Sequence, residues 1–127
     1  MTARGAHVLI IEDDEPLAAI LSAHLTARGF GVTVAPTAEE AVARLRDGLR
    51  PDLVLLDINL PGDTGWSVVR SEALVEAGDP PVVVASAMAV DPARLREFDV
   101  AGYLPKPFAL ETLTTTIDRL LAVEKPE

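Results

Sequence analysis

The chain has 127 residues, a formal net charge of −9 and no cysteine. This length suits one domain with a hydrophobic core, which we place at about residues 6–122, with 123–127 as a C-terminal tail or the start of a linker. The negative charge argues against direct binding to nucleic acid or to an anionic membrane, and disulfides and thiol catalysis are excluded. The apolar runs are too short to span a bilayer and the N-terminus lacks the features of a secretory signal, so we expect a soluble cytoplasmic protein.

The first part of the chain alternates a strand-length apolar run with a segment of helical period. Residues 7–11 are rich in β-branched side chains and predict a β-strand. Glu15-Pro16 opens a segment with an apolar helical stripe, which Gly29 ends in the manner of a C-terminal cap. Residues 31–35 predict a second strand.

The middle of the chain repeats this alternation. Thr37 and Glu40 form the pattern of a capping box, which predicts a helix that closes near residues 47–48. Residues 53–56 are apolar throughout, which is typical of a strand buried on both faces in a parallel sheet. A helix over about 65–77 follows, and residues 81–85 form another continuous apolar run.

The last third predicts a short helix, a short strand and a long helix. Asp91 is a favourable N-cap, and Leu95 and Phe98 are the inward anchors expected for the helix that it begins. Residues 102–104 predict the fifth strand. The final helix carries one apolar stripe, formed by Leu110, Leu113, Ile117, Leu120 and Leu121.

Five strand–helix units of this size predict an α/β fold, a doubly wound parallel sheet of the (βα)5 type. The commonest order for five strands is the flavodoxin-like order 2-1-3-4-5, in which ligands bind at the carboxyl ends of strands 1 and 3. Glu12, Asp13 and Asp57 stand at those two strand ends. We therefore expect the three acids at one crevice.

Clustered carboxylates repel one another, so such a cluster is typical of a cation site. Two carboxylates, a backbone carbonyl and waters suit Mg²⁺, with Mn²⁺ as an alternative. Asp14 is a second candidate for the acidic pair, although the strand-end register favours Glu12 and Asp13.

A carboxylate beside Mg²⁺ can attack a phosphoryl group and form an aspartyl phosphate, which makes Asp57 a candidate nucleophile. Lys106 lies between two prolines after the fifth strand and is a candidate cation for the phosphoryl group. Ser86 ends the fourth strand and is a candidate donor to a phosphoryl oxygen. Each of the last two is a weak signal alone, because a surface lysine or a turn serine is common.

Four sequence motifs in this order carry a family resemblance. From Val8 to Leu121 the chain resembles a response-regulator receiver domain of bacterial two-component signalling. The motifs are VLIIEDDEP at 8–16, DLVLLD at 52–57 with LPG at 60–62 and Gly65, VASA at 84–87, and AGYLPKPF at 101–108.

The resemblance implies a role for each site residue and a cis peptide bond between Lys106 and Pro107. The implied metal ligands are Asp13, Asp57, the backbone carbonyl of Asn59, and Glu12 largely through water. The implied phosphoryl site has Asp57 as phosphoacceptor, Lys106 as its catalytic cation, Ser86 as the hydroxyl that turns toward the phosphoryl group, and Tyr103 as the aromatic switch that follows.

The resemblance also implies partners and a lifetime for the phosphoryl group. A sensor histidine kinase, a phosphotransfer protein or a small phosphodonor would phosphorylate Asp57, and the surface of the fourth helix, fifth strand and fifth helix would control a downstream protein or form a homodimer on phosphorylation. Such a domain is no conventional enzyme, but it assists its own phosphorylation and dephosphorylation. Asn59 and Met88 are the positions that tune the lifetime, and Met88 predicts slow loss of phosphate because a thioether orients water poorly.

Three other functions are weaker alternatives. A phosphatase with an aspartate nucleophile would need a second acid where Asn59 stands. A flavin-mononucleotide binder would need a neutral phosphate loop in place of the acids at 12–15. A degenerate receiver that only mediates contacts would not need the full set of site residues.

Overall fold

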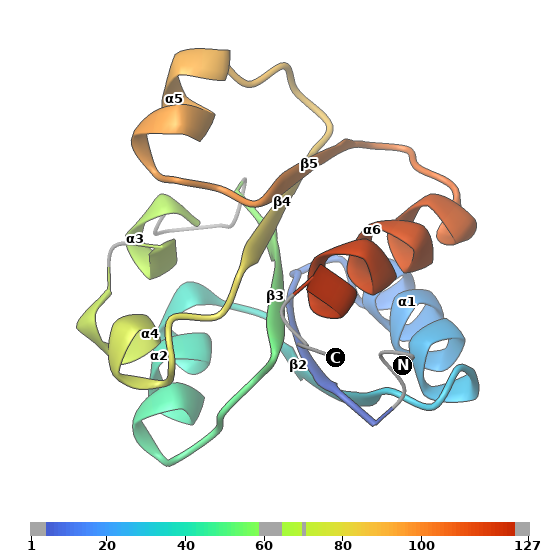
Figure 1. Cartoon of the computed structure of the whole chain (residues 1–127), viewed down its shortest axis with the longest axis horizontal. Helices are drawn as coiled ribbons and strands as arrows, with labels where there is room; N and C mark the ends of the chain where they lie inside the picture. The colour runs from blue at the N-terminus through green and yellow to red at the C-terminus, as the bar shows by residue number, and fades with distance from the viewer. Residues whose placement is uncertain (1–4, 59–64, 70, 124–127) are drawn as a thin grey trace.

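The computed structural model describes residues 5–58, 65–69 and 71–123. Five parallel strands form one sheet in the order β2-β1-β3-β4-β5, as the sequence predicts. Figure 1 shows this sheet through the middle of the molecule, with α1 and α6 on one face and α2, α3, α4 and α5 on the other. Within the described residues, no helix has both the length and the apolar character needed to cross a membrane.

The strand register brings the carboxyl ends of the central strands to one edge of the sheet. Ile11 pairs with Leu56, Asp57 with Ala85, and Ser86 with Pro105. The strands are β1 (His7–Ile11), β2 (Gly31–Ala35), β3 (Leu53–Asp57), β4 (Val82–Ser86) and β5 (Gly102–Pro105).

The sequence predicts the side-chain caps at Thr37 and Asp91, and the structure adds a further cap at Asp14. The amide of Leu17 donates to Asp14, that of Glu40 to Thr37, and that of Ala93 to Asp91. The helices are α1 (Glu15–Ala27), α2 (Ala38–Arg46), α3 (Trp66–Val69), α4 (Glu72–Glu76), α5 (Pro92–Glu97) and α6 (Leu110–Val123).

The single helix predicted over 65–77 is wrong, because α3 and α4 are separate pieces. Ser71 has an extended backbone, with φ −70° and ψ 142°, and acts as the N-cap of α4. Its hydroxyl donates to the carbonyl of Val68 at 2.8 Å and accepts from the amide of Leu74 at 3.2 Å. Serine side chains compete with helical hydrogen bonds in this way, which explains the break.

The sheet separates two hydrophobic clusters. One lies against α1 and α6 and includes Leu21, Leu25, Leu113 and Ile117, and the other lies against the helices of the opposite face. The anchors predicted for α5 are weaker than expected. None of its residues is buried, and Leu95 and Phe98 are only partly covered.

Candidate functional site

Three carboxylates meet at the carboxyl edge of the sheet. Glu12 follows β1 and is 4% exposed, whereas Asp57 is the last residue of β3 and is 6% exposed. Asp13 is exposed. One carboxylate oxygen from each residue can be chosen so that all three lie within 4.8 Å of one another. The topology therefore brings together the three acids that the sequence places at the strand ends.

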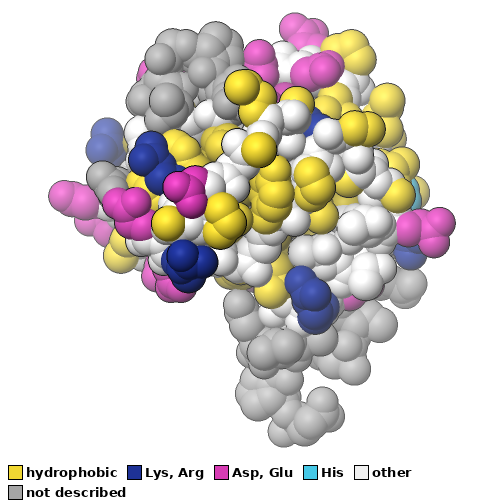
Figure 2. All heavy atoms as spheres, turned by 90° about the horizontal axis from the view of Figure 1, so that it is seen from above, with side chains coloured by type: hydrophobic (Ala, Val, Ile, Leu, Met, Phe, Trp, Pro, Cys, Tyr) yellow, Lys and Arg dark blue, Asp and Glu magenta, His cyan; other side chains and the backbone are white. Residues whose placement is uncertain are grey.

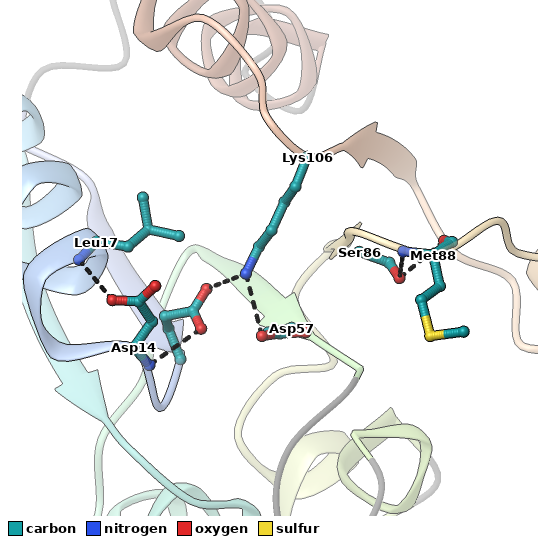
Figure 3. Close-up of polar contacts among 7 residues, drawn as sticks. Asp14, Leu17, Asp57, Ser86, Met88 and Lys106 are labelled. Carbon is teal, nitrogen blue, oxygen red and sulfur yellow. Dashed lines mark hydrogen bonds and ion pairs between the residues drawn. The ribbon is translucent and has the colours of Figure 1, made fainter.

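Lys106 reaches this cluster from the turn after β5. Its Nζ atom lies 2.7 Å from Oε1 of Glu12 and 3.1 Å from Oδ2 of Asp57. Figure 3 shows the lysine side chain extending down to Asp57 from above. The Lys106-Pro107 peptide bond is cis, as the family resemblance implies.

Burial dominates the electrostatics of Glu12. Burial raises its pKa to about 7, and the neighbouring carboxyl of Asp57 acts in the same direction, whereas the hydrogen bonds from Lys106 and the amide of Asp14 oppose the rise. Burial by itself would lower the pKa of Lys106, but its bonds to Glu12 and Asp57 outweigh that effect and leave the pKa raised. Lys106 therefore stays charged near neutral pH, while Glu12 changes charge there.

Asp14 has a structural role beside the acidic cluster. Its Oδ1 accepts from the amide of Leu17 at 3.1 Å, which caps α1. Its own amide donates to Oε2 of Glu12 at 3.2 Å and helps to hold that carboxylate. Asp14 thus supports the start of α1 and the placement of Glu12, and Asp13 completes the cluster.

Ser86 and Tyr103 converge on the backbone of Met88. The Ser86 hydroxyl is buried, donates to the Met88 carbonyl at 2.9 Å and accepts from the Met88 amide at 3.0 Å. The Tyr103 hydroxyl donates to the same carbonyl at 3.4 Å. Figure 3 shows Ser86 on the opposite side of Asp57 from Asp14. The family resemblance implies a role for the Met88 side chain, which is 68% exposed, whereas the Met88 backbone makes the contacts described here.

Gly65 packs directly on the backbone that carries Asp57. Its amide donates to the carbonyl of Ile58 at 3.2 Å. A Cβ atom at this position would lie 2.8 Å from the carbonyl oxygen of Asp57 and 2.8 Å from Cα of Ile58. The sequence offers no signal for this close approach beyond the glycine itself. Asn59, the predicted backbone ligand and lifetime-tuning position, lies outside the described residues.

The donor set at the site fits a hard divalent cation. Three carboxylates supply oxygen atoms, which are the ligands that Mg²⁺ prefers. The high pKa of Glu12 means that its charge is poorly compensated by Lys106 alone. A second cation among these acids would lower that pKa and relieve the repulsion.

The chain matches a family described as the response regulator receiver domain over residues 8–118. It is 39% identical to the transcriptional activator protein PfeR of Pseudomonas aeruginosa over 117 residues, which cover 90% of this chain and 37% of that protein. It is 32% identical to the phosphate regulon transcriptional regulatory protein PhoB of Rhizobium meliloti over 123 residues, 94% of this chain and 54% of that protein. The chain thus spans about half or less of the length of these two relatives.

Solved structures share the fold. A receiver domain protein of Methanospirillum hungatei, described as CheY-like, superposes with a TM-score of 0.86 at 22% identity and covers 94% of this chain and 96% of its own. The response regulator TrrA of Thermotoga maritima, in complex with Mg²⁺-BeF, superposes with a TM-score of 0.78 at 26% identity and covers 91% of this chain and 99% of its own.

Proposed function

Since the chain belongs to the response regulator receiver domain family, we propose that Asp57 accepts a phosphoryl group and that this modification controls a partner protein. The observation that carries the proposal is the placement of the Asp57 carboxylate, 3.1 Å from the Lys106 ammonium and among the carboxylates of Glu12 and Asp13. A nucleophile, a fixed cation and a set of metal ligands are the parts that phosphoryl transfer to a carboxylate requires.

Glu12, Asp13 and Asp57 would hold Mg²⁺ or Mn²⁺, together with the backbone carbonyl of Asn59. When bound, the cation neutralises negative charge between the carboxylates and the incoming phosphoryl oxygens. The structure of TrrA with Mg²⁺-BeF supports this assignment by analogy.

The side chains of the chain perform the remaining steps. An Asp57 oxygen attacks phosphorus, and the bond from phosphorus to the donor nitrogen or oxygen breaks. The donor is the phosphohistidine of a sensor kinase or phosphotransfer protein, or a small acyl phosphate. Lys106 pairs with the added phosphoryl oxygens. These steps take place in the cytoplasm, where kinase phosphodonors are made. The domain, with its core at residues 6–122, acts as a substrate that assists its own phosphorylation. It is not a conventional enzyme.

The phosphoryl group also competes for the Ser86 hydroxyl. Ser86 must leave the Met88 carbonyl to donate to a phosphoryl oxygen, and Tyr103 shares that carbonyl. The two residues therefore switch together, because a change in one alters the hydrogen bonding of the other. Hydrolysis later restores the starting state, at a rate that depends on the side chains of Asn59 and Met88.

The output surface is the face of α5, β5 and α6. These elements correspond to the fourth helix, fifth strand and fifth helix, which the family resemblance implies as the partner surface. Figure 2 looks down on the side where α5 lies and shows apolar side chains across its middle, with basic and acidic side chains around them. A mixed surface of this kind suits a protein partner, either a downstream protein or a second phosphorylated copy. Direct contact with nucleic acid or membrane is not part of the proposal.

Acetyl phosphate and Mg²⁺ provide the direct test. Intact-mass spectrometry is expected to show one added phosphoryl group on the wild-type chain and none on Asp57→Asn. Asp118→Asn is the matched control, because Asp118 is an exposed residue of α6 and should be labelled normally. Labelling that persists in Asp57→Asn would place the acceptor elsewhere and contradict the proposal.

A further inference from the structure

An aromatic pair joins the segment after the phosphorylation site to the output surface. Trp66 opens α3, and its ring stacks on that of Phe98 at the C-terminal end of α5, with ring centroids 4.5 Å apart and planes at 29°. The guanidinium of Arg94, also on α5, lies 5.7 Å from the centroid of each ring. Stacked rings with a nearby cation depend on a particular relative orientation, unlike a contact between aliphatic side chains.

The Trp66 end of this pair is tied to Asp57. Trp66 directly follows Gly65, whose amide donates to the carbonyl of Ile58. Gly65 also packs so closely on the carbonyl of Asp57 that a single added carbon would clash with it. A shift of the peptide after Asp57 therefore displaces Gly65, and Trp66 moves with it.

The Phe98 end of the pair lies beside a helix that is largely exposed. No residue of α5 is buried, and only Leu95, Phe98 and the following Val100 are partly covered on this side. Phe98, which directly follows α5, also lines a hollow of about 370 Å³ with Val69, Leu74 and the segments that lead into β4 and β5. A helix with so little buried surface can change position at a low cost in free energy.

We propose that the Trp66–Phe98 stack couples the backbone at Asp57 to α5, as a second route beside the one through Ser86, Met88 and Tyr103. The proposal rests on the proposed phosphorylation of Asp57. The first route passes along β4 and β5, whereas this one passes through Gly65 and α3 on one face of the sheet. Both converge on the α5–β5–α6 face.

The test compares Phe98→Leu with the wild-type chain by NMR. At rest, hydrogen exchange of the α5 amides is expected to be roughly two- to ten-fold faster in Phe98→Leu, which reflects the loss of an aromatic pair. Addition of Mg²⁺ and beryllofluoride, a mimic of the acyl phosphate, is expected to cause smaller chemical-shift changes of the α5 amides in Phe98→Leu than in the wild-type chain. The chemical-shift changes at Ser86 and Tyr103 are expected to be the same as in the wild-type chain.

Two further variants separate coupling from packing. Phe98→Tyr keeps the ring and should behave as wild type. Phe30→Leu removes a buried ring from the opposite hydrophobic cluster, and should leave the α5 response intact. Trp66→Leu breaks the stack from the other side and replaces Phe98→Leu if that variant does not fold.

The outcomes separate this inference from the proposed function. The coupling would be overturned if the α5 amides had the same hydrogen-exchange rates and the same chemical-shift changes in Phe98→Leu as in wild type. That result would leave the proposed phosphorylation site intact. Failure of wild type to bind beryllofluoride, observed by fluorine NMR, would overturn the phosphoryl site and with it the coupling to phosphorylation. The exchange measurement at rest then still decides whether the stack holds α5.

Discussion

Glu12→Gln is expected to make the metal-free protein more stable at about pH 8, although it removes one partner of an ion pair. Glu12 is 4% exposed, and burial raises its pKa from 4.5 to about 7 even with Lys106 at 2.7 Å. The folded state therefore binds more protons than the unfolded state between these two values. The free energy of unfolding of the wild-type chain falls as the pH rises through this window.

The size of the effect follows from the same two pKa values. Each unit of pKa difference corresponds to about 1.4 kcal/mol, so the rise in the pKa of Glu12 from 4.5 to about 7 sets an upper limit of about 3.5 kcal/mol. Coupling to Lys106 and Asp57 spreads the titration, and we expect about 1–3 kcal/mol at pH 8. The uncharged amide variant has no such loss. Lys106 keeps Asp57 as a partner at 3.1 Å.

Urea unfolding in a chelator, followed by Trp66 fluorescence and circular dichroism, measures the difference at about pH 5 and about pH 8. Glu76→Gln, at an exposed site on α4, is the control and should show no effect. Adding Mg²⁺ should reverse the order at high pH, because an amide is a weaker ligand than a carboxylate. If Glu12→Gln were less stable than wild type at high pH without metal, the reasoning would be refuted. The ion pair of Glu12 with Lys106 would then stabilise the fold by more than the burial of the Glu12 charge destabilises it.

The remaining predictions concern the site in action. Lys106→Ala should retain acetyl-phosphate labelling at Asp57 but weaken the response of α5 amides to it, and an unchanged NMR response would contradict that role. Met88→Glu should shorten the lifetime of the phosphoryl group, because a carboxylate orients water better than a thioether, and a lifetime equal to wild type would exclude the idea. The apparent Mg²⁺ affinity should fall by up to about ten-fold per pH unit below the Glu12 pKa of about 7, measured by Trp66 fluorescence, whereas a pH-independent affinity would remove Glu12 from the site.

The sheet and the acidic cluster could be predicted because they depend on rules that act along the chain. Continuous apolar runs give buried parallel strands, and right-handed crossovers leave few strand orders. Strands β1 and β2 begin and end at the predicted residues. Once the order is known, Glu12 and Asp57 must lie at adjacent strand ends. The roles of these residues in phosphoryl transfer are still predictions.

Other features depend on how particular side chains meet in space. The split between α3 and α4 arises from a single serine hydroxyl, which a helical apolar pattern does not reveal. The direct contact of Lys106 with Glu12 depends on the reach of a long side chain across the sheet edge. The stack of Trp66 on Phe98 joins two segments with no shared pattern, and so neither ring could be paired from the sequence.

The close packing at Gly65 limits which substitutions the chain can accept beside the acidic cluster. The obstacle is spatial and not conformational, because the φ angle of Gly65 lies outside the left-handed range. Two of the atoms that would block a Cβ belong to the backbone, so no rotamer change can clear them. Even alanine would push the first turn of α3 outward. An engineer who redesigns the specificity of this domain can vary exposed positions of α5 such as Ala93 and Arg96, but has to leave position 65 without a side chain.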